Sequence, residues 1–309
     1  GLPAIMTITL AIGVQRMAQR HAVIRRLPAV ETLGSVTTIC SDKTGTLTRN
    51  EMTVQQVVLA DGHVDVEGAG YAPDGALRRG DEALDAATLA HRAPVLAALA
   101  KVAALCNDAS VHEADGRWTL AGDPTEGALL TLAMKAGLNP AELKVERARL
   151  DVIPFESEHR FMATLHAAGD DDGGSVALVK GAPERVLAMC SRQLADDGSE
   201  PPLDAPRWQA EVEAQARAGR RVLALARRRF AHAKEDLDHP DVAQGLTLLG
   251  LVGIIDPPRD EAIRAVAQCT AAGIRVVMIT GDHGVTASAI AAQLGMGEGL
   301  QAVTGPELE

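Results

Sequence analysis

Two charged side chains stand next to each other where an apolar segment of this chain ends. Asp42 and Lys43 follow residues 36–40 (VTTIC), and Gly45 comes shortly after them. An apolar run that ends in a polar, glycine-containing turn predicts a buried parallel strand. Such a strand delivers side chains to the carboxyl edge of a sheet, where α/β folds bind ligands. A carboxylate there can attack a phosphoryl group and form an aspartyl-phosphate, while Lys43 and a magnesium ion would offset the phosphate charge.

An isolated Asp-Lys pair would be more simply explained as a polar turn after a strand, but the pair lies within a longer pattern. Residues 40–53 read CSDKTGTLTRNEMT. This stretch resembles the phosphorylation site of the P-type cation-transporting ATPases, and a match of this length is specific. The resemblance implies that Asp42 is the phosphorylated nucleophile and that Lys43 and Thr44 complete the catalytic group. It also implies that Asp42 and Thr44 bind Mg²⁺.

Thr44 separates this site from a related class of enzymes. The same strand and loop resemble phosphatases of the haloacid dehalogenase superfamily, which usually carry a second Asp two residues after the nucleophile as general acid and base. A threonine cannot protonate a leaving group or activate water near neutral pH, so an acyl-phosphate at Asp42 should persist. A persistent phosphorylated state suits a pump, which must hold that state while ions move.

Composition limits the remaining classes of protein. The chain has 309 residues, enough for two domains, and 47% of them are hydrophobic but only 2% aromatic. Its cores must therefore be built from Ala, Val, Leu and Ile. A formal charge of -11 argues against nucleic-acid binding. The four cysteines show no metal-ligand spacing and are expected to be small buried residues of a reducing compartment.

The first residues are apolar and are followed by a basic segment. Residues 1–14 carry no charged side chain, whereas Arg16, Arg20, Arg25 and Arg26 come soon after. This order fits the cytoplasmic end of a membrane helix, although the apolar run is too short to span a bilayer. A helix of a soluble protein is the alternative. The opening GLPAI also resembles the residues after the Pro-Glu of the fourth membrane helix in type II pumps, so we expect a fragment of a longer protein.

Two segments far apart in the chain both have an α/β pattern. The first ends at Asp42, and the second begins near Gly253 with the signal DPPR at 256–259. There we predict a helix over 260–272, a parallel strand over 274–279 and a helix over 285–294. The strand ends in Thr280, Gly281 and Asp282, so both segments deliver polar residues from strand ends. One doubly wound sheet interrupted by a long insertion explains this order.

The insertion has the pattern of an antiparallel sheet with helices. Strands are predicted at 145–153, 162–167, 175–180, 221–227 and 246–254. Helices are predicted at 86–105, 124–136, 183–190 and 206–218. The glycine-rich residues 61–85 are expected to form a long loop or hairpin.

Within the insertion, several motifs resemble the nucleotide-binding signatures of type II P-type ATPases. In GDPTEGAL at 122–129, the resemblance implies that Glu126 contacts the adenine amino group, although first-turn preferences alone would explain the Pro and Glu. In PFESEHRFM at 154–162, Phe155 matches a phenylalanine that stacks on adenine, and a core Phe is the alternative. Arg160 stands where many relatives have lysine, which keeps the charge but changes the donor geometry.

Three further motifs complete this nucleotide constellation. Lys180 in KGAPE at 180–184 matches a lysine deep in the ATP pocket, and an ordinary strand-turn-helix would explain the Gly and Pro but not the lysine. Arg221 matches an arginine that contacts the phosphates, with an exposed basic edge strand as the alternative. Thr280, Gly281 and Asp282 resemble a phosphate-side motif, and a polar loop that caps a helix is the alternative.

We therefore expect a Rossmann-like phosphorylation domain of the haloacid dehalogenase type, split by an inserted α+β nucleotide-binding domain with an antiparallel sheet. The expected division is 1–20 for the end of a membrane helix, 21–50 and 251–309 for the two parts of the phosphorylation domain, the second truncated, and 51–250 for the nucleotide-binding domain. The two connections near residues 50 and 250 would form the hinge.

The resemblance covers nearly the whole chain and implies the catalytic cytoplasmic part of an ATP-driven cation pump, with ATP and Mg²⁺ as ligands. The parent would be a multi-pass protein of the cell membrane. The fragment alone is expected to be an incomplete enzyme, because it lacks the family's Gly-Asp-Gly-x-Asn-Asp segment. Calcium is the first choice of cation, with sodium, protons or potassium open. The rivals are a stand-alone nucleotide-binding or regulatory module and a soluble phosphatase, and Thr44 argues against the latter.

Overall fold

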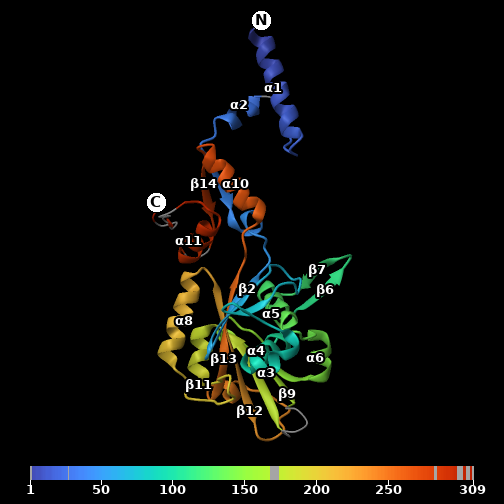
Figure 1. The fold of residues 1–309 in the computed structure, drawn as a ribbon, viewed down its shortest axis with the longest axis vertical. Helices are drawn as coiled ribbons and strands as arrows, with labels where there is room; N and C mark the ends of the chain where they lie inside the picture. The colour runs from blue at the N-terminus through green and yellow to red at the C-terminus, as the bar shows by residue number, and fades with distance from the viewer. Residues whose placement is uncertain are drawn as a thin grey trace.

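The computed structural model describes residues 2–26, 28–167, 174–281, 284–297, 302–303 and 307. Figure 1 shows three parts in a row along the long axis of the chain. Helices α1 (Leu2–Ala18) and α2 (Pro28–Gly34) lie at one end. A small part built around β1 (Thr38–Asp42) and β14 (Arg275–Ile279) comes next, and a large sheet with its helices occupies the other end.

The large part is built on an antiparallel sheet, as the sequence predicts. Among the described residues this sheet has ten strands, in the order β5-β4-β3-β2-β13-β12-β10-β9-β8, with β11 pairing parallel to β13. The strands from β2 to β5 are Thr53–Leu59, Gly62–Val66, Leu77–Arg79 and Glu82–Leu84. Strands β8 to β13 are Arg149–Ile153, Phe161–Ala167, Ser175–Gly181, Cys190–Gln193, Arg221–Phe230 and Leu246–Ile255.

Helices cover both faces of this sheet, and each face has its own core. One face packs against α4 (Pro94–Leu105) and α5 (Pro124–Lys135), through residues such as Leu99 and Leu129. The other packs against α7 (Pro183–Met189), α8 (Ala205–Arg217) and α9 (His239–Val242), where Trp208 is fully buried. Neighbouring residues of one strand, such as Phe161 and Met162, point to opposite cores, as the two-residue period of a strand requires.

Shorter elements complete the large part. Strands β6 (Ser110–Ala114) and β7 (Arg117–Ala121) form a separate hairpin. Helix α6 (Pro140–Glu146) precedes β8, and η2 (Ala86–Thr88) and α3 (Leu89–Arg92) precede α4.

The small part contains the predicted parallel strand pair. Asp42, the last residue of β1, lies opposite Ile279, the last residue of β14. The turn η1 (Lys43–Leu47) follows β1, while α10 (Asp260–Ala271) and α11 (Gly284–Gln293) flank β14 in the chain. A third core lies here, and its buried members are Leu47, Ile255, Ala262, Ile290 and Leu294.

Strand β1 is less buried than the sequence predicts. Ile39 is 38% exposed, which corrects the expectation of a buried strand. Cys40 is exposed as well, contrary to prediction, whereas Cys106 is buried as predicted and Cys190 and Cys269 are half-buried. The physical reason is the size of the sheet: β1 pairs with β14 alone among the described strands, and the small core covers only part of such a pair.

Local chemistry also corrects two predicted elements. The helix expected over 86–105 breaks before Pro94, whose ring lacks an N–H, and Ala93 has φ -146° and ψ 65°. The strand expected from residue 145 begins at Arg149, because Asn139 and Pro140 start helix α6 instead. Residues 61–85, predicted as a long loop or hairpin, form the short antiparallel strands β3, β4 and β5 of the sheet.

The chain passes between the small and large parts twice, through residues 48–52 and 256–259. These two connections run antiparallel and hydrogen-bond to each other. The Arg49 amide donates to the Pro257 carbonyl at 3.0 Å, and the Arg259 amide donates to the Leu47 carbonyl at 2.9 Å. Asp256 is 5% exposed and accepts from the Thr48 hydroxyl at 2.6 Å and from the Glu51 amide at 3.3 Å. The predicted hinge residues therefore form one hydrogen-bonded unit.

Within the described ranges, no single helix is long and apolar enough to cross a membrane. Helix α1 is apolar but short, and the helices at 86–92 and 94–105 reach the needed length only together, across a bend of 117°.

Candidate functional site

The centre of the predicted nucleotide site is an ion pair between Lys180 and Glu126. The two side chains are 9% and 16% exposed, and Lys180 Nζ contacts Glu126 Oε1. The other carboxylate oxygen of Glu126 accepts from the Asp108 amide at 3.2 Å. A carboxylate offers about four acceptor positions, so Glu126 keeps capacity for an amino group of a ligand. Desolvation makes such a pair costly to break, because removing one partner leaves a charge in a poorly solvated place.

Strong local signals place Glu126 in the first turn of α5. Asp123 caps the helix, accepting from the Thr125 amide at 2.8 Å and the Glu126 amide at 3.3 Å, and Pro124 occupies the first turn. Gly122 has φ +125°, and a Cβ there would lie 2.7 Å from the Ala109 Cβ. The loop before α5 therefore favours glycine at this position.

A close backbone approach brings the turn that carries Phe155 and Arg160 next to Lys180. The Ala182 amide donates to the Arg160 carbonyl at 2.9 Å, and a Cβ on Gly181 would lie 2.5 Å from that same oxygen. Pro183 then starts α7. The strand-turn-helix predicted for KGAPE is thus present, and its glycine is explained by this contact.

Phe155 and Arg160 differ in how their side chains are held. Phe155 lies in the turn between β8 and β9, outside the core, and is 61% exposed. Arg160 has φ +56° and donates to Glu184 Oε1 at 2.6 Å. Both members of this pair are more than half exposed, so it stabilises the fold little. The exposed ring of Phe155 offers a free face for stacking.

Arg221 connects the nucleotide motifs to the small part. It is the first residue of β12, and its guanidinium donates to the Thr125 hydroxyl at 3.4 Å. With its neighbour Arg220, it lines a cavity of about 370 Å³ that also includes Lys43, Asp256 and Gly281. Nearby, the end of α8 meets α11, since a Cβ on Gly219 would lie 2.6 Å from the Ala289 Cβ.

Arg220 and Asp256 also line this cavity, and the sequence analysis did not predict them as candidate site residues. Arg220 donates to Gln56 Oε1 at 3.1 Å and Gln215 Oε1 at 2.9 Å, and its burial lowers the pKa of the guanidinium while Asp65 opposes the shift. The signal for Arg220 was the pair of arginines after Gly219. Asp256 opens the DPPR signal, but its contact with Thr48 crosses most of the chain and leaves no local pattern.

The predicted phosphorylation residues lie at the edge where β1 and β14 end. Asp42 is exposed, and its Oδ1 accepts from the Thr44 amide at 3.3 Å, while Lys43 is buried. The parallel register places Thr280, directly after Ile279, at the same edge. Gly281 borders the cavity described above, and Asp282 lies outside the described residues. The structure thus brings the two predicted strand ends together, and the roles of these residues stay predictions.

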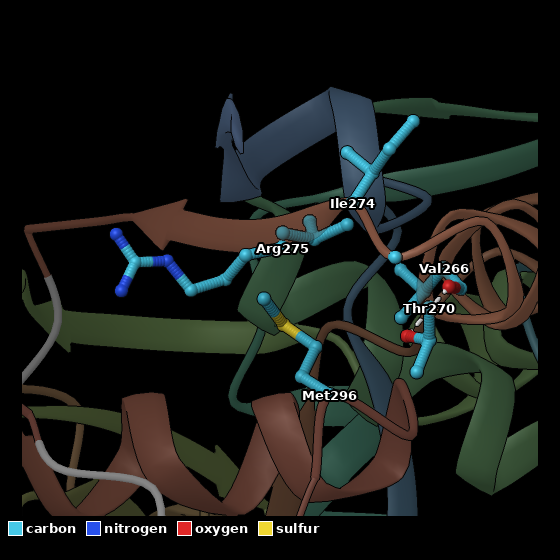
Figure 2. Close-up of a pocket in the computed structure, with 7 residues that line it drawn as sticks. Val266, Thr270, Ile274, Arg275 and Met296 are labelled. Atoms are coloured by element: carbon cyan, nitrogen blue, oxygen red, sulfur yellow. Dashed lines mark hydrogen bonds between the residues drawn. The ribbon is translucent and has the colours of Figure 1, made fainter. Parts of the chain in front are cut away.

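A second cavity, of about 260 Å³, lies between α10 and β14. Figure 2 shows Val266, Thr270, Ile274 and Met296 around it, with the Arg275 side chain extending away from α10. The Thr270 hydroxyl already donates to the Val266 carbonyl at 3.0 Å. None of the predicted site residues lines this cavity.

The family model described as P-type ATPase, cytoplasmic domain N, matches residues 95–261, more than half of the chain. The chain belongs to the P-type ATPase family. It is 49% identical over 97% of its length to the cation-transporting ATPase pma1 of Synechocystis sp.. It is 47% identical over its whole length to the probable cation-transporting ATPase F of Mycobacterium tuberculosis. It is 40% identical, again over its whole length, to the calcium-transporting ATPase type 2C member 1 of Homo sapiens.

The chain spans about a third of the length of these P-type ATPases, 33% of the first two and 32% of the third. Most of the large sheet falls within the matched range, since the match begins in α4 and ends in α10. The mixed α/β structure with its antiparallel sheet is consistent with the N domain of this family.

The side chains fit the ligands that a P-type ATPase of this kind uses. Glu126, Lys180 and the exposed Phe155 offer an acceptor, a cation and a stacking face to a nucleotide. Within the part of the chain that the structure describes, no three or more His, Cys, Asp or Glu side chains gather as a metal site. A magnesium ion keeps several waters and needs only one or two carboxylates besides substrate phosphates, so Asp42 is compatible with such an ion.

Proposed function

We propose that this chain is the nucleotide-binding and phosphorylated part of an ATP-driven cation pump, with an aspartyl-phosphate formed at Asp42. The observation that carries the proposal is the shared cavity of Lys43 and Arg221. Lys43 follows Asp42 in the chain, and Arg221 contacts Thr125, the residue before Glu126. The cavity is thus lined by the neighbour of the predicted nucleophile and by one residue of the predicted nucleotide site, which supports the close approach that transfer of a phosphoryl group requires.

We further propose the division into domains that the sequence indicates. Residues 21–50 and 251–309 would form one haloacid dehalogenase-like phosphorylation domain, and residues 51–250 the inserted nucleotide-binding domain. The parallel β1–β14 pair and its separate small core support the first assignment. The ten-stranded sheet, which starts at Thr53 and ends at Ile255, supports the second.

In this proposal, each site residue has a role set by its chemistry. Glu126, Phe155 and Lys180 hold the adenosine of ATP, and Arg160 and Arg221 contribute positive charge toward its phosphates. The Asp42 carboxylate attacks the γ-phosphorus, and the bond from that phosphorus to the oxygen of ADP breaks. Lys43 offsets the negative charge at the transferring group, with Thr280, Gly281 and Asp282 on the phosphate side.

Thr44 would keep the phosphorylated state long-lived, because its side chain cannot act as a general base for water. Bound Mg²⁺, held by Asp42 and Thr44, would supply neutralising charge at the phosphate oxygens.

The transported ion is proposed from the names of relatives. The human protein quoted above and a protein of Bacillus subtilis, 41% identical, are both named calcium-transporting ATPases. We propose calcium as the cation, and a full-length parent in the cell membrane with this segment on its cytoplasmic side. ATP-driven uptake of calcium by vesicles that contain the full-length protein tests this, with sodium, potassium and pH gradients measured in parallel.

The proposed chemistry is tested with Asp42→Asn in the full-length protein. The amide is nearly isosteric but is not an anionic nucleophile, so the acid-stable, hydroxylamine-sensitive phosphoenzyme should disappear while ATP binding remains. The matched control is Asp115→Asn, at an exposed turn of the β6–β7 hairpin where φ is +52° and Asn is well tolerated. Normal phosphoenzyme in Asp42→Asn would place the nucleophile elsewhere.

A further inference from the structure

The loop between β3 and β4 has a closed shape. At its neck, the Glu67 amide donates to the Ala76 carbonyl at 2.9 Å. Gly68 has φ +85°, and a Cβ there would lie 2.2 Å from the Asp74 carbonyl oxygen. Lys135, near the end of α5, donates to the Glu67 carbonyl at 2.5 Å. Residues 67–76, which we name the Tyr71 loop, are therefore held both at their base and against α5.

One side of the Tyr71 loop contacts the connections between the two parts of the chain. The Gly70 amide donates to the Thr53 hydroxyl at 3.0 Å, and that hydroxyl donates to the Glu51 carbonyl at 3.3 Å. A Cβ on Gly70 would lie 2.7 Å from Glu51 Oε2, and Gly70 has φ +79°. Thr53 is only 3% exposed. The loop is thus fitted against the connection at 51–53.

The other side of the loop contacts the helix that carries Glu126. Tyr71 is 9% exposed, and a Cβ on Gly127 would lie 2.9 Å from the Tyr71 Cε1 atom. The Thr131 hydroxyl lies 3.5 Å from the Tyr71 carbonyl. The ring of Tyr71 therefore rests against the first turn of α5, where a residue larger than glycine at position 127 would clash with both Leu120 and Tyr71.

The phenol of Tyr71 lies among acidic side chains from both of these regions. Burial, together with the charges of Glu51, Asp256 and Asp123, raises the pKa of Tyr71 to about 12, against the opposing effect of a backbone hydrogen bond with Met52. Glu51 and Asp256 belong to the connections, and Asp123 caps α5. The phenol consequently stays neutral near pH 7, which is the form that these three carboxylates tolerate.

We propose that Tyr71 is a positioning residue that fixes the two connections relative to helix α5, and so sets how bound nucleotide is presented to Asp42. The second half of this statement rests on the proposed function, whereas the first half concerns the fold alone. A side chain packed between two segments favours one arrangement of them, because a shift of either segment loses contacts that the interior cannot replace. The glycines at 70 and 127 are what allow the loop and the ring to approach both segments.

Hydrogen exchange of the whole chain tests the first half, with Tyr71→Phe as the variant. The ring remains and only the hydroxyl is removed, so the fold is retained. Tyr71→Phe removes the hydrogen bond between the Tyr71 hydroxyl and the Met52 backbone, which ties the ring to the connection at 51–53. The amides of Arg49, Glu51 and Arg259, which hydrogen-bond within the connections, should therefore exchange about five-fold faster, the effect of losing one buried hydrogen bond. Exchange in β9 and β10 should be unchanged, and so should the affinity of the chain for ATP.

The matched control is Thr164→Val, which also removes a buried hydroxyl from the large part. Thr164 is fully buried and bonds to His166 at 3.0 Å, in a strand that does not reach the connections. It should speed exchange around β9 and leave the connections unaffected. A second variant, Thr53→Val, removes the acceptor of the Gly70 amide and should reproduce the pattern of Tyr71→Phe. Equal exchange increases over the whole large part, or none at the connections, would overturn the positioning role.

In the full-length protein, Tyr71→Phe should slow phosphoenzyme formation without changing the ATP concentration that gives half-maximal labelling. A change confined to that ATP concentration would instead assign Tyr71 to nucleotide binding and refute the inference. Failure of the proposed function has a different signature: the wild-type chain would not bind ATP, or Asp42→Asn would still be phosphorylated. The exchange data would still report on Tyr71 in that case.

Discussion

At the scale of single residues, Lys180 and Phe155 differ in how much each side chain contributes to the stability of the folded chain. Lys180 and Glu126 form a largely buried pair, so either change would leave an uncompensated charge. Phe155 is 61% exposed, and its ring stabilises the folded chain little. A change at Phe155 therefore reports on ligand binding more cleanly than one at Lys180.

We expect Phe155→Ala and Lys180→Ala each to weaken ATP binding by about 1 to 3 kcal/mol, through lost stacking and a lost charge contact. Titration calorimetry of the folded variants measures the effect. The controls are Val145→Ala, which removes an exposed apolar side chain, and Lys101→Ala, which removes an exposed charge. If both site variants titrate like the wild type, these residues do not line an adenosine pocket.

At the scale of elements, strand β9 contains a histidine whose charge the fold disfavours. His166 is 2% exposed, with Nδ1 2.9 Å from the Arg147 carbonyl and Nε2 3.0 Å from the Thr164 hydroxyl. Burial lowers the pKa of His166, and Arg149 lowers it further, while the backbone contacts raise it. The unfolded chain thus binds a proton at a higher pH than the folded chain does.

The sign of the pH effect follows from this depressed pKa. Stability from His166 is fully present above the unfolded pKa of about 6.5 and is lost as the pH falls below it, by at most about 1.4 kcal/mol per pH unit. Urea unfolding of the large part between pH 7.5 and 5 measures this loss. His166→Gln should be less stable at pH 7.5 but should lose less stability on acidification. Parallel pH profiles for the two proteins would exclude His166 as the source.

At the scale of the whole molecule, the described residues form three hydrophobic cores, which belong to two of their three sheets. Two cores lie on the faces of the ten-stranded sheet, and the third belongs to the small part. The parts are joined by two connections that hydrogen-bond to each other. Separate cores with a narrow junction favour separate unfolding of the two parts.

We expect calorimetry of the chain to show two unfolding transitions and residues 51–256 alone to reproduce one of them. ATP should raise the temperature of that transition only, since a ligand stabilises the part that binds it. The same segment with Lys180→Ala should show a smaller shift. One cooperative transition for the chain, together with an unfolded isolated segment, would show that the two parts form a single folding unit.

The sequence alone determined the features that depend on near neighbours. Asp123 and Pro124 predict the start of α5, and Gly181 and Pro183 predict the turn from β10 into α7, because capping and turn chemistry act over a few residues. The antiparallel sheet and the strand before Asp42 were predicted in the same way, from short apolar runs and their flanking turns. The motifs around these elements also led to the family.

Only the tertiary structure decided which of these elements meet. The pairing of β1 with β14, the Lys180–Glu126 contact and the exposure of β1 depend on partners that lie far away in the chain. A hydrophobic period shows that one face is buried but does not identify the element that covers it. Tyr71 is the clearest case: nothing near it in sequence indicates Asp256 or Asp123, and chain folding alone brings their charges around its phenol.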